Sequence, residues 1–270
     1  MSVLAYKAVI DPGRRSEIES RISEIEATNQ VRVMFAIESG SRAWGFPSPD
    51  SDYDVRFVYA HTAASYLSVF DRRDVIELPI EGDLDINGWD IRKALALLLK
   101  PNPVLLEWLS SPIKYKWDDR ACESLLDFAN KVVAPAECVS HYYHLALRQW
   151  QRNIEGEASV NLKKYFYVLR PALAIRWVRL SPGELPPMNF QELVSKADID
   201  AALQEEISGL LHAKARASEV GMGKRIAPLD ELIEFELSWG EKNSSQKRVT
   251  STAEREMADQ LFRKLVRWPA

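Results

Sequence analysis

Two aspartates separated by one residue, Asp52 and Asp54, carry the clearest chemical signal in this 270-residue sequence. They stand at the start of an apolar stretch, YDVRFVYA, whose composition is typical of a β-strand. Because side chains alternate along a strand, we expect both carboxylates on one face. Two carboxylates so close repel each other unless a cation lies between them. Hard oxygen ligands of this kind suit Mg²⁺, and the phosphates of a substrate often complete its coordination shell. The pair predicts a Mg²⁺ site, with Mn²⁺ as the alternative ion.

A glycine turn precedes the aspartates. Gly40 and Ser41 follow the apolar stretch VRVMFAIE, and a glycine lets the backbone turn closely around an anion while N–H groups and a hydroxyl face phosphate oxygens. Arg42 could bind phosphate, but it could equally be a solvated residue or the partner of a surface acid. An isolated Asp-x-Asp is usually turn chemistry or a helix cap, but the order strand, Gly-Ser, spacer, Asp-x-Asp, strand favours catalysis.

A third carboxylate is expected on the short stretch DLDIN. Three carboxylates can hold two metal ions, which activate an attacking hydroxyl and stabilise in-line displacement at the α-phosphate. Asp85 is preferred because its strand phase turns Leu84 and Ile86 toward the core. Asp83 and Asp90 remain alternatives, although Asp90 is better explained as a helix cap. The general base is unassigned, and Asp85 is one candidate.

A second group of candidates lies on a helix expected over residues 159–180. Lys163, Tyr167 and Arg170 are spaced i, i+4 and i+7, which places them on one face. Leucine and phenylalanine side chains form the opposite, apolar face. A basic and aromatic face could contact phosphates and stack on a base, whereas the plainer explanation is charges that extend from the helix into solvent.

The elements that must position these residues change in character along the chain. Apolar spacing predicts a surface helix over 17–28 and strands over 31–38, 53–60, 74–80 and 83–87, which together indicate a small mixed sheet. From Asp90 onward the pattern is helical. The expected helices there begin at Asp90 and after Pro103 and then cover 118–132, 136–155, 159–180, 189–196, 198–216, 228–242 and 252–267. We therefore expect a catalytic α/β domain over 1–117 and a helical domain over 118–270 that completes the nucleotide and acceptor cleft.

Composition adds limits of its own. The sequence is 46% hydrophobic and 27% charged with a net charge of −4, so a nucleic-acid partner would have to meet a local basic patch. Cys122 and Cys138 are not spaced as zinc ligands. The opening stretch, MSVLAYKAVIDPGRR, lacks the apolar core of a leader peptide, and no run of about 18 apolar residues occurs. We expect a soluble, cytoplasmic protein without a membrane partner, and the oligomeric state stays open.

Gly40-Ser41 followed by Asp52-x-Asp54 resembles the signature of the DNA polymerase β nucleotidyltransferase superfamily. More narrowly, three blocks resemble the nucleotidyltransferase family called YcgL or RlaP, which is named for its association with RNA ligase and RNA repair operons. The blocks are ESGSRAWGFPSPDSDYDVRFVY, DINGWDIRKALALLLKPNPVLLEWLSSP and LKKYFYVLRPALAIRW. They cover much of residues 38–111 and 162–177.

The resemblance implies an α+β fold with a five-stranded mixed sheet flanked by helices, and a nucleoside triphosphate such as ATP as donor. Asp52 and Asp54 carry over as metal ligands, and Asp85 carries over as the third carboxylate. The resemblance also implies that a lysine-bearing helix, here with Lys163, contacts the triphosphate. The expected reaction transfers a nucleoside monophosphate to an acceptor hydroxyl, with RNA, such as tRNA or another RNA end, as the acceptor.

Two other functions remain open from the sequence. The enzyme could adenylylate a protein, as antitoxin-type nucleotidyltransferases do, or a small molecule such as an aminoglycoside. The chain could also be an inactive nucleotide-binding protein, but two retained, mutually repelling carboxylates argue against that.

Overall fold

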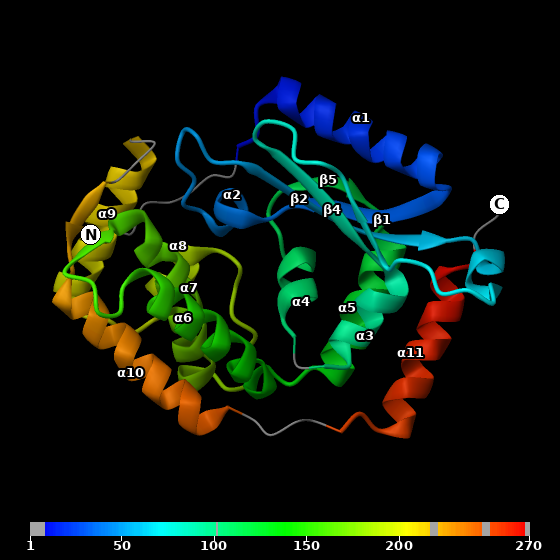
Figure 1. Ribbon diagram of the computed structural model, residues 1–270. Helices are drawn as coiled ribbons and strands as arrows, with labels where there is room; N and C mark the ends of the chain where they lie inside the picture. Colours follow the sequence, from blue (N-terminus) through cyan, green and yellow to red (C-terminus); the bar gives the residue numbers. More distant parts are fainter. Residues whose placement is uncertain (1–8, 101, 217–220, 245–248, 268–270) are drawn as a thin grey trace. The chain divides into compact units, whose positions relative to one another are not determined.

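The computed structural model describes residues 9–100, 102–216, 221–244 and 249–267 (Figure 1). It confirms the α+β class, with a mixed sheet and many helices. No described helix is both long enough and apolar enough to span a bilayer. Residues 1–8, on which the expectation about a leader peptide partly depends, lie outside the described residues.

The chain forms two compact units, and each is built from segments that are not continuous in the sequence. The sheet unit comprises the described residues of segments 8–43, 52–133 and 249–270, and the helical unit those of 44–51 and 134–248. This division differs from a single boundary near residue 117. The helix after that point stays with the sheet, and residues 44–51 leave the sheet unit just before the two aspartates.

The sheet unit is built on five strands in the order β3-β4-β2-β1-β5. Strands β2 and β4 run parallel, whereas β1 pairs antiparallel with β2 and β5, and β3 pairs antiparallel with β4. The bounds are β1 Val31–Glu38, β2 Tyr53–His61, β3 Val75–Glu77, β4 Leu84–Asp90 and β5 Lys114–Trp117. The four expected strands are therefore present. Strand β5 was not predicted, because its four residues are of mixed polarity and show no strand pattern.

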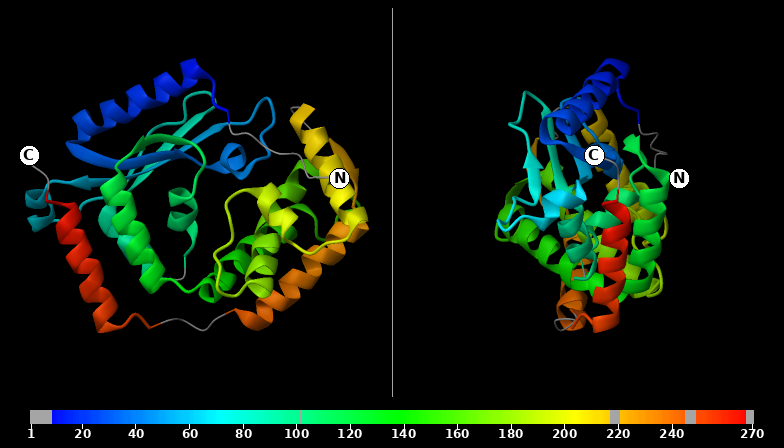
Figure 2. Two further views of the ribbon diagram at one scale, coloured as in Figure 1. Left: turned by 180° about the vertical axis from the view of Figure 1, so that it is seen from behind. Right: turned by 90° about the vertical axis from the view of Figure 1, so that its right-hand side faces the viewer.

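Both faces of this sheet are covered, which explains why β1 is apolar along nearly its whole length. On one face lies α1, Pro12–Asn29, which begins at an Asp11 cap with proline at its first position. Its expected stripe of Ile18, Ile22 and Ile25 is buried against the sheet. On the other face lie α3, Ile91–Leu98, α4, Val104–Leu109, and α5, Asp119–Val132 (Figures 1 and 2). The last helix, α11, Thr252–Leu265, packs on α3 and α5.

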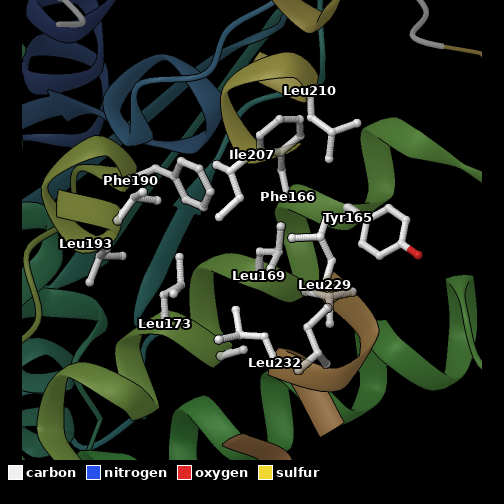
Figure 3. Close-up of a cluster of buried hydrophobic side chains, with 14 of the residues drawn as sticks. Tyr165, Phe166, Leu169, Leu173, Phe190, Leu193, Ile207, Leu210, Leu229 and Leu232 are labelled. Atoms are coloured by element: carbon white, nitrogen blue, oxygen red, sulfur yellow. The ribbon is translucent and has the colours of Figure 1, made fainter. Parts of the chain in front are cut away.

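The helical unit surrounds α7, Tyr165–Leu180, whose side chains are buried on almost every side. Its main neighbours are α6, Val139–Asn153, α10, Ala227–Asn243, and α8, Phe190–Ser195. Figure 3 shows the leucine and aromatic side chains that meet there. The remaining elements are the 3₁₀ turns η2, Pro135–Cys138, and η3, Leu162–Lys164, the helix α9, Ala201–Arg216, and the two-stranded ribbon of β6, Ser159–Asn161, and β7, Met222–Lys224.

Two segments differ from the expected elements. The helix expected over 159–180 begins only at Tyr165, because residues 159–161 pair with β7 and Asn161 accepts a hydrogen bond from the Lys163 backbone to start η3. Lys163 therefore lies on a 3₁₀ turn, before the helix that carries Tyr167 and Arg170. Near the start of the chain, residues 40–44 form a short helix, α2, Gly40–Trp44.

Phe46 explains why residues 44–51 belong to the helical unit. Its side chain is 3% exposed. It stacks on Phe166 with 5.0 Å between ring centroids and meets Phe190 edge-on at 5.5 Å. An eight-residue excursion between two sheet-unit segments thus supplies a core aromatic to the helical unit.

Candidate functional site

The parallel pairing of β2 with β4 places Asp54 directly opposite Asp85, as Cα partners in register. Strand alternation turns Leu84 and Ile86 into the core, as expected, and leaves the two aspartates on the other face. Each carboxylate side chain is 29% exposed. The structure therefore brings Asp85, the preferred third carboxylate, beside Asp54.

The two alternative carboxylates are engaged elsewhere. Asp83 Oδ1 accepts a hydrogen bond of 2.6 Å from Arg14 Nη2 on α1. Asp90 caps α3 by accepting from the Arg92 backbone at 2.7 Å, and it also accepts from the Tyr66 hydroxyl at 2.9 Å. Burial raises the pKa of this carboxyl. The cap expected at Asp90 is confirmed.

Asp52 precedes β2 and is the most exposed of the three candidate carboxylates. Its backbone oxygen accepts a hydrogen bond of 3.2 Å from Arg42 Nε, and the Arg42 guanidinium lies 3.9 Å from the centroid of the Tyr53 ring. Burial raises the pKa of Asp54, opposed by Arg56 and reinforced by the charges of Asp85 and Asp52. The three carboxylates are thus coupled electrostatically on one end of β2 and β4.

Gly40 makes room for Asp54. Its φ angle is +56°, and a Cβ at this position would lie 1.8 Å from Asp54 Oδ2. A backbone hydrogen bond joins the same two segments, the Gly40 turn and the start of β2: the Ser39 N–H donates to the Asp54 carbonyl at 2.8 Å. Ser41 follows, at 8% exposure. The glycine is required both for its left-handed backbone and for the absence of a side chain.

Arg56 is a site residue that the sequence reasoning missed. Its Nη2 donates to Asp54 Oδ1 at 3.2 Å and to Asp85 Oδ2 at 2.7 Å. Its Nη1 donates to the Val55 and Asp85 carbonyls at 2.9 and 3.1 Å. The signal was available, because Arg56 follows Asp54 by two residues and alternation puts both on one face. The guanidinium neutralises the repulsion that was expected to require a cation.

Glu38, the last residue of β1, was also missed. It is fully buried, accepts from the Asp54 backbone at 3.0 Å and accepts from the Tyr115 hydroxyl at 2.7 Å. Burial raises the pKa of Glu38 to about 7, against the lowering effect of the Tyr115 hydrogen bond. A charged residue that ends an apolar strand directly before a glycine turn was the available signal. Glu38 ties β1, β2 and β5 together behind Asp54.

The candidates of the helical unit do not form one exposed basic face. Lys163 Nζ lies 4.0 Å from Asp50 Oδ1. Tyr167 is half-buried and meets Trp44 edge-on, with ring centroids 6.2 Å apart. Arg170 is 3% exposed, donates from Nε to the Met188 carbonyl at 3.2 Å, and lies 4.7 Å from the Trp44 ring. The plainer alternative, in which the Arg170 side chain extends into solvent, is wrong, because α7 is the buried centre of this unit.

A second lysine, Lys214 on α9, was missed as well. It is 1% exposed, and its Nζ lies 5.4 Å from the centroid of the Phe46 ring. Lys214 follows Leu203, Ile207 and Leu210 at helical spacing, so it occupies a position on the apolar stripe. A lysine on such a stripe was the available signal.

The donor types at the end of β2 and β4 suit a hard cation. Among the described residues, however, no three His, Cys, Asp or Glu side chains are arranged to hold a metal as they stand. Arg56 occupies the position between the Asp54 and Asp85 oxygens. A divalent ion bound by these two carboxylates would require this guanidinium to move aside.

Comparison with known proteins shows the family to which the chain is similar. A family model described as RlaP, the RNA repair pathway DNA polymerase beta family, matches residues 15–264. The uncharacterized protein YcgL of Bacillus subtilis strain 168 is 43% identical over 223 residues, which are 83% of this chain and 85% of that protein. Among solved structures, the chain is similar to a nucleotidyltransferase-like protein of Exiguobacterium sibiricum 255-15, with 14% identity, a TM-score of 0.28, and coverage of 94% of this chain and 80% of that one.

Proposed function

Because the chain belongs to the RlaP family, the RNA repair pathway DNA polymerase beta family, we propose that it transfers a nucleoside monophosphate from a nucleoside triphosphate to a hydroxyl of RNA and releases pyrophosphate. Family membership makes it a polymerase β-like nucleotidyltransferase. The observation that carries the proposal is the register of β2 and β4, which sets Asp54 opposite Asp85 with Asp52 two residues away.

The three carboxylates are the proposed ligands of Mg²⁺, with Mn²⁺ as a substitute. When bound there, the ion would neutralise triphosphate charge and lower the pKa of the attacking hydroxyl. Gly40 keeps Asp54 in place by leaving its carboxylate room, and Glu38 holds the Asp54 backbone through a hydrogen bond of 3.0 Å. The backbone N–H groups at the start of α2 and the Ser41 hydroxyl are the proposed contacts of the triphosphate.

Arg56 has a defined part in this proposal. Its guanidinium balances Asp54 and Asp85 before substrate binds. With a cation held by Asp54 and Asp85, the guanidinium would be free to contact another anion, and we propose the developing charge of the transferred phosphoryl group as that partner.

The proposed acceptor is an RNA end, as the family description suggests for an RNA repair pathway. The net charge of −4 means that general attraction to nucleic acid is weak, so recognition would depend on a local surface. The reaction would therefore be more sensitive to the structure of the RNA end than to bulk polyanion.

The test is incubation of the purified chain with each α-³²P-labelled nucleoside triphosphate, Mg²⁺, and a mixture of tRNA and short RNA oligomers. We expect label in RNA from one or more of the nucleotides. The matched control is Asp54→Asn, which keeps the shape and removes the charge, and we expect a loss of at least about a hundredfold because a charge-stabilising group is removed from the transition state.

Asp52→Asn and Asp85→Asn complete the set. Label that persists unchanged in all three variants would remove these carboxylates from the reaction. Label that appears in a protein band and not in RNA would replace the acceptor and keep the chemistry.

A further inference from the structure

Strand β3 is an edge of the five-stranded sheet, and the outer side of its backbone is unpaired. The Asp74 carbonyl and the Leu78 N–H bond to β4, at 2.9 and 3.0 Å. Because backbone groups alternate in direction along a strand, the N–H and C=O groups of Val75 and Glu77 point away from β4. None of the described residues hydrogen-bonds to these outward groups.

The other edge strand of the sheet, β5, is partly covered. Arg15 of α1 donates from Nη1 to the Lys114 carbonyl at 2.8 Å. The Lys114 ammonium in turn lies 3.6 Å from the centroid of the Trp117 ring. An uncovered edge strand is a template for pairing with a strand of another chain. Of the two edges, β3 is therefore the one that can accept a partner strand.

Large apolar side chains are exposed on both flanks of β3. Before the strand, Leu67, Val69 and Phe70 are 85%, 95% and 82% exposed. After the strand, Ile80 is 71% exposed. Scattered apolar side chains on a surface are ordinary, but a group of them beside an unpaired strand edge indicates an interaction surface.

The sequence around Val75 is complementary to itself. When two copies of a strand pair antiparallel about Val75, residues at equal distances on its two sides face each other. Arg73 of one copy then faces Glu77 of the other. Phe70 and Ile80, each five residues from Val75, lie on flanks that come together. The outward backbone groups of Val75 have the direction that this central pair requires.

We propose that the chain forms a two-fold symmetric dimer in which β3 pairs antiparallel with β3 of a second copy, centred on Val75. The ion pair between Arg73 and Glu77 within the chain is exchanged for two ion pairs between the copies. The apolar flanks of each copy are covered by the other. Because the contact uses the same open edge of both copies, it is closed, and association stops at the dimer. The dimer does not depend on the proposed function.

A different explanation treats β3 as a protected edge. Short strands with charged side chains commonly prevent pairing between sheets, and β3 has three residues with Arg73, Asp74 and Glu77 in or beside it. The chain would then be a monomer, and changes in these charges would leave its mass in solution unchanged. The protected edge does not account for charges and apolar groups arranged symmetrically about one residue.

The first test is sedimentation equilibrium of the full-length chain over the micromolar concentration range. We expect a dimer for wild type and a monomer for Val75→Pro, which removes an outward N–H and leaves the bonds to β4 in place. Proline is tolerated at such positions of an edge strand, so the melting temperature should stay close to that of wild type. A wild-type chain that is monomeric over this range overturns the inference.

Charge reversal tests the register of the pairing. Arg73→Glu and Glu77→Arg each bring like charges face to face twice in a dimer. We expect each variant alone to associate at least about tenfold more weakly than wild type, because attractive cross-strand pairs become repulsive. In an equal mixture of the two variants, opposite charges face each other again, and we expect the mixture to dimerise. The matched control is Arg72→Glu, which lies on the other face of the strand and should stay dimeric.

The mixture separates the dimer from an effect of the internal ion pair. Neither variant regains its own Arg73–Glu77 pair when the two are mixed, so restored association can come only from pairs between copies. Single variants that dimerise as wild type does would refute the proposed register. A mixture that stays monomeric would do the same.

Discussion

At the scale of single residues, Arg56 stands where a cation was expected. Its Nη2 contacts Asp54 Oδ1 and Asp85 Oδ2 at 3.2 and 2.7 Å. The same two oxygens are proposed metal ligands, so the guanidinium and a divalent ion compete for them. Competition of this kind has a measurable signature, because a ligand stabilises a protein in proportion to its preference for the folded state.

We expect Arg56→Met to be less stable than wild type by about 1–3 kcal/mol in EDTA, because hydrogen bonds to charged groups are lost and the carboxylates repel. Mg²⁺ should raise the melting temperature of this variant more than that of wild type. Arg120→Met, at an exposed position of the same unit, is the control and should respond as wild type does. An equal response of Arg56→Met and wild type to Mg²⁺ would place the ion elsewhere.

Lys214 gives a prediction in pH. Burial, with Lys163 adding to it, lowers its folded-state pKa from 10.5 to about 8. Between these two values the unfolded chain binds more protons than the folded one, so stability rises with pH across this window and the cost is fully present below it. The shift corresponds to roughly 3 kcal/mol at 1.36 kcal/mol for each pKa unit.

Lys214→Met removes that cost. Its gain in the free energy of unfolding over wild type should be largest at pH 7 and smaller at pH 9.5, when measured by urea denaturation. The control Lys224→Met should show no such pH dependence. A gain that is identical at both pH values would mean that the pKa of Lys214 is the same in the folded and unfolded states.

Sequence reasoning reached only some of these residues. Asp52, Asp54 and Asp85 could be selected from the sequence, because strand alternation predicts which face of the sheet each side chain occupies. Arg56 obeys the same alternation, but a basic residue was not sought among ligands for a cation. Their apolar surroundings in the sequence mark Glu38 and Lys214 as unusual, but their roles depend on contacts with segments distant in the sequence, which the sequence pattern does not give.

At the scale of elements, one buried carboxylate joins α10 to α7. Glu236 is fully buried, and its oxygens accept from Arg176 Nη1 at 3.0 Å and from Arg179 Nη2 and Nε at 2.7 and 3.2 Å. Arg176 also donates to the Asp198 carbonyl at 2.6 Å. The cluster therefore couples two helices and the segment before α9.

Glu236→Ala should lower the free energy of unfolding by about 3–5 kcal/mol, because two largely buried guanidinium groups lose their counter-charge. Glu231→Ala, at an exposed position on the same helix, should change it little. Chemical denaturation of both variants makes the comparison. Similar losses in the two would indicate that α10 is held by its apolar face alone.

The elements themselves were predictable where one period extended over many residues. The stripe of α1 and the strands β1 and β2 are of this kind. Strand β5 and the β6-η3 stretch were not, because a segment of three or four residues has too few positions to show a period. The all-round burial of α7 misled the assignment of Arg170, since a helix with three neighbours has no free polar face.

At the scale of the whole molecule, neither unit is continuous in sequence. Residues 44–51 leave the sheet unit to supply Phe46 to the helical core, and α11 returns to the sheet unit after the helical unit. A boundary drawn at one position could not represent this. Sequence composition changes near residue 117, but composition does not show that residues 44–51 and α11 belong to a different unit from their neighbours in the sequence.

Phe46→Ala should destabilise the helical unit by about 3–5 kcal/mol, because a large aromatic is removed from a closed core. Urea unfolding followed by tryptophan fluorescence measures this, with Phe235→Ala, 57% exposed on α10, as the control. An effect no greater than that of the control would mean that the unit closes over the gap left between Phe166 and Phe190.

The packing of α11 on the sheet unit has a consequence for the order in which the chain folds during synthesis. Synthesis proceeds from the N-terminus, so β1 through α5 emerge first, and the helix that packs on α3 and α5 emerges only after every element of the helical unit. Until residues 252–265 are released, the apolar surface that α11 covers, which includes Leu95 and Leu99 beside Phe262, stays bare. The sheet unit of a nascent chain therefore stays incomplete until its last helix has emerged.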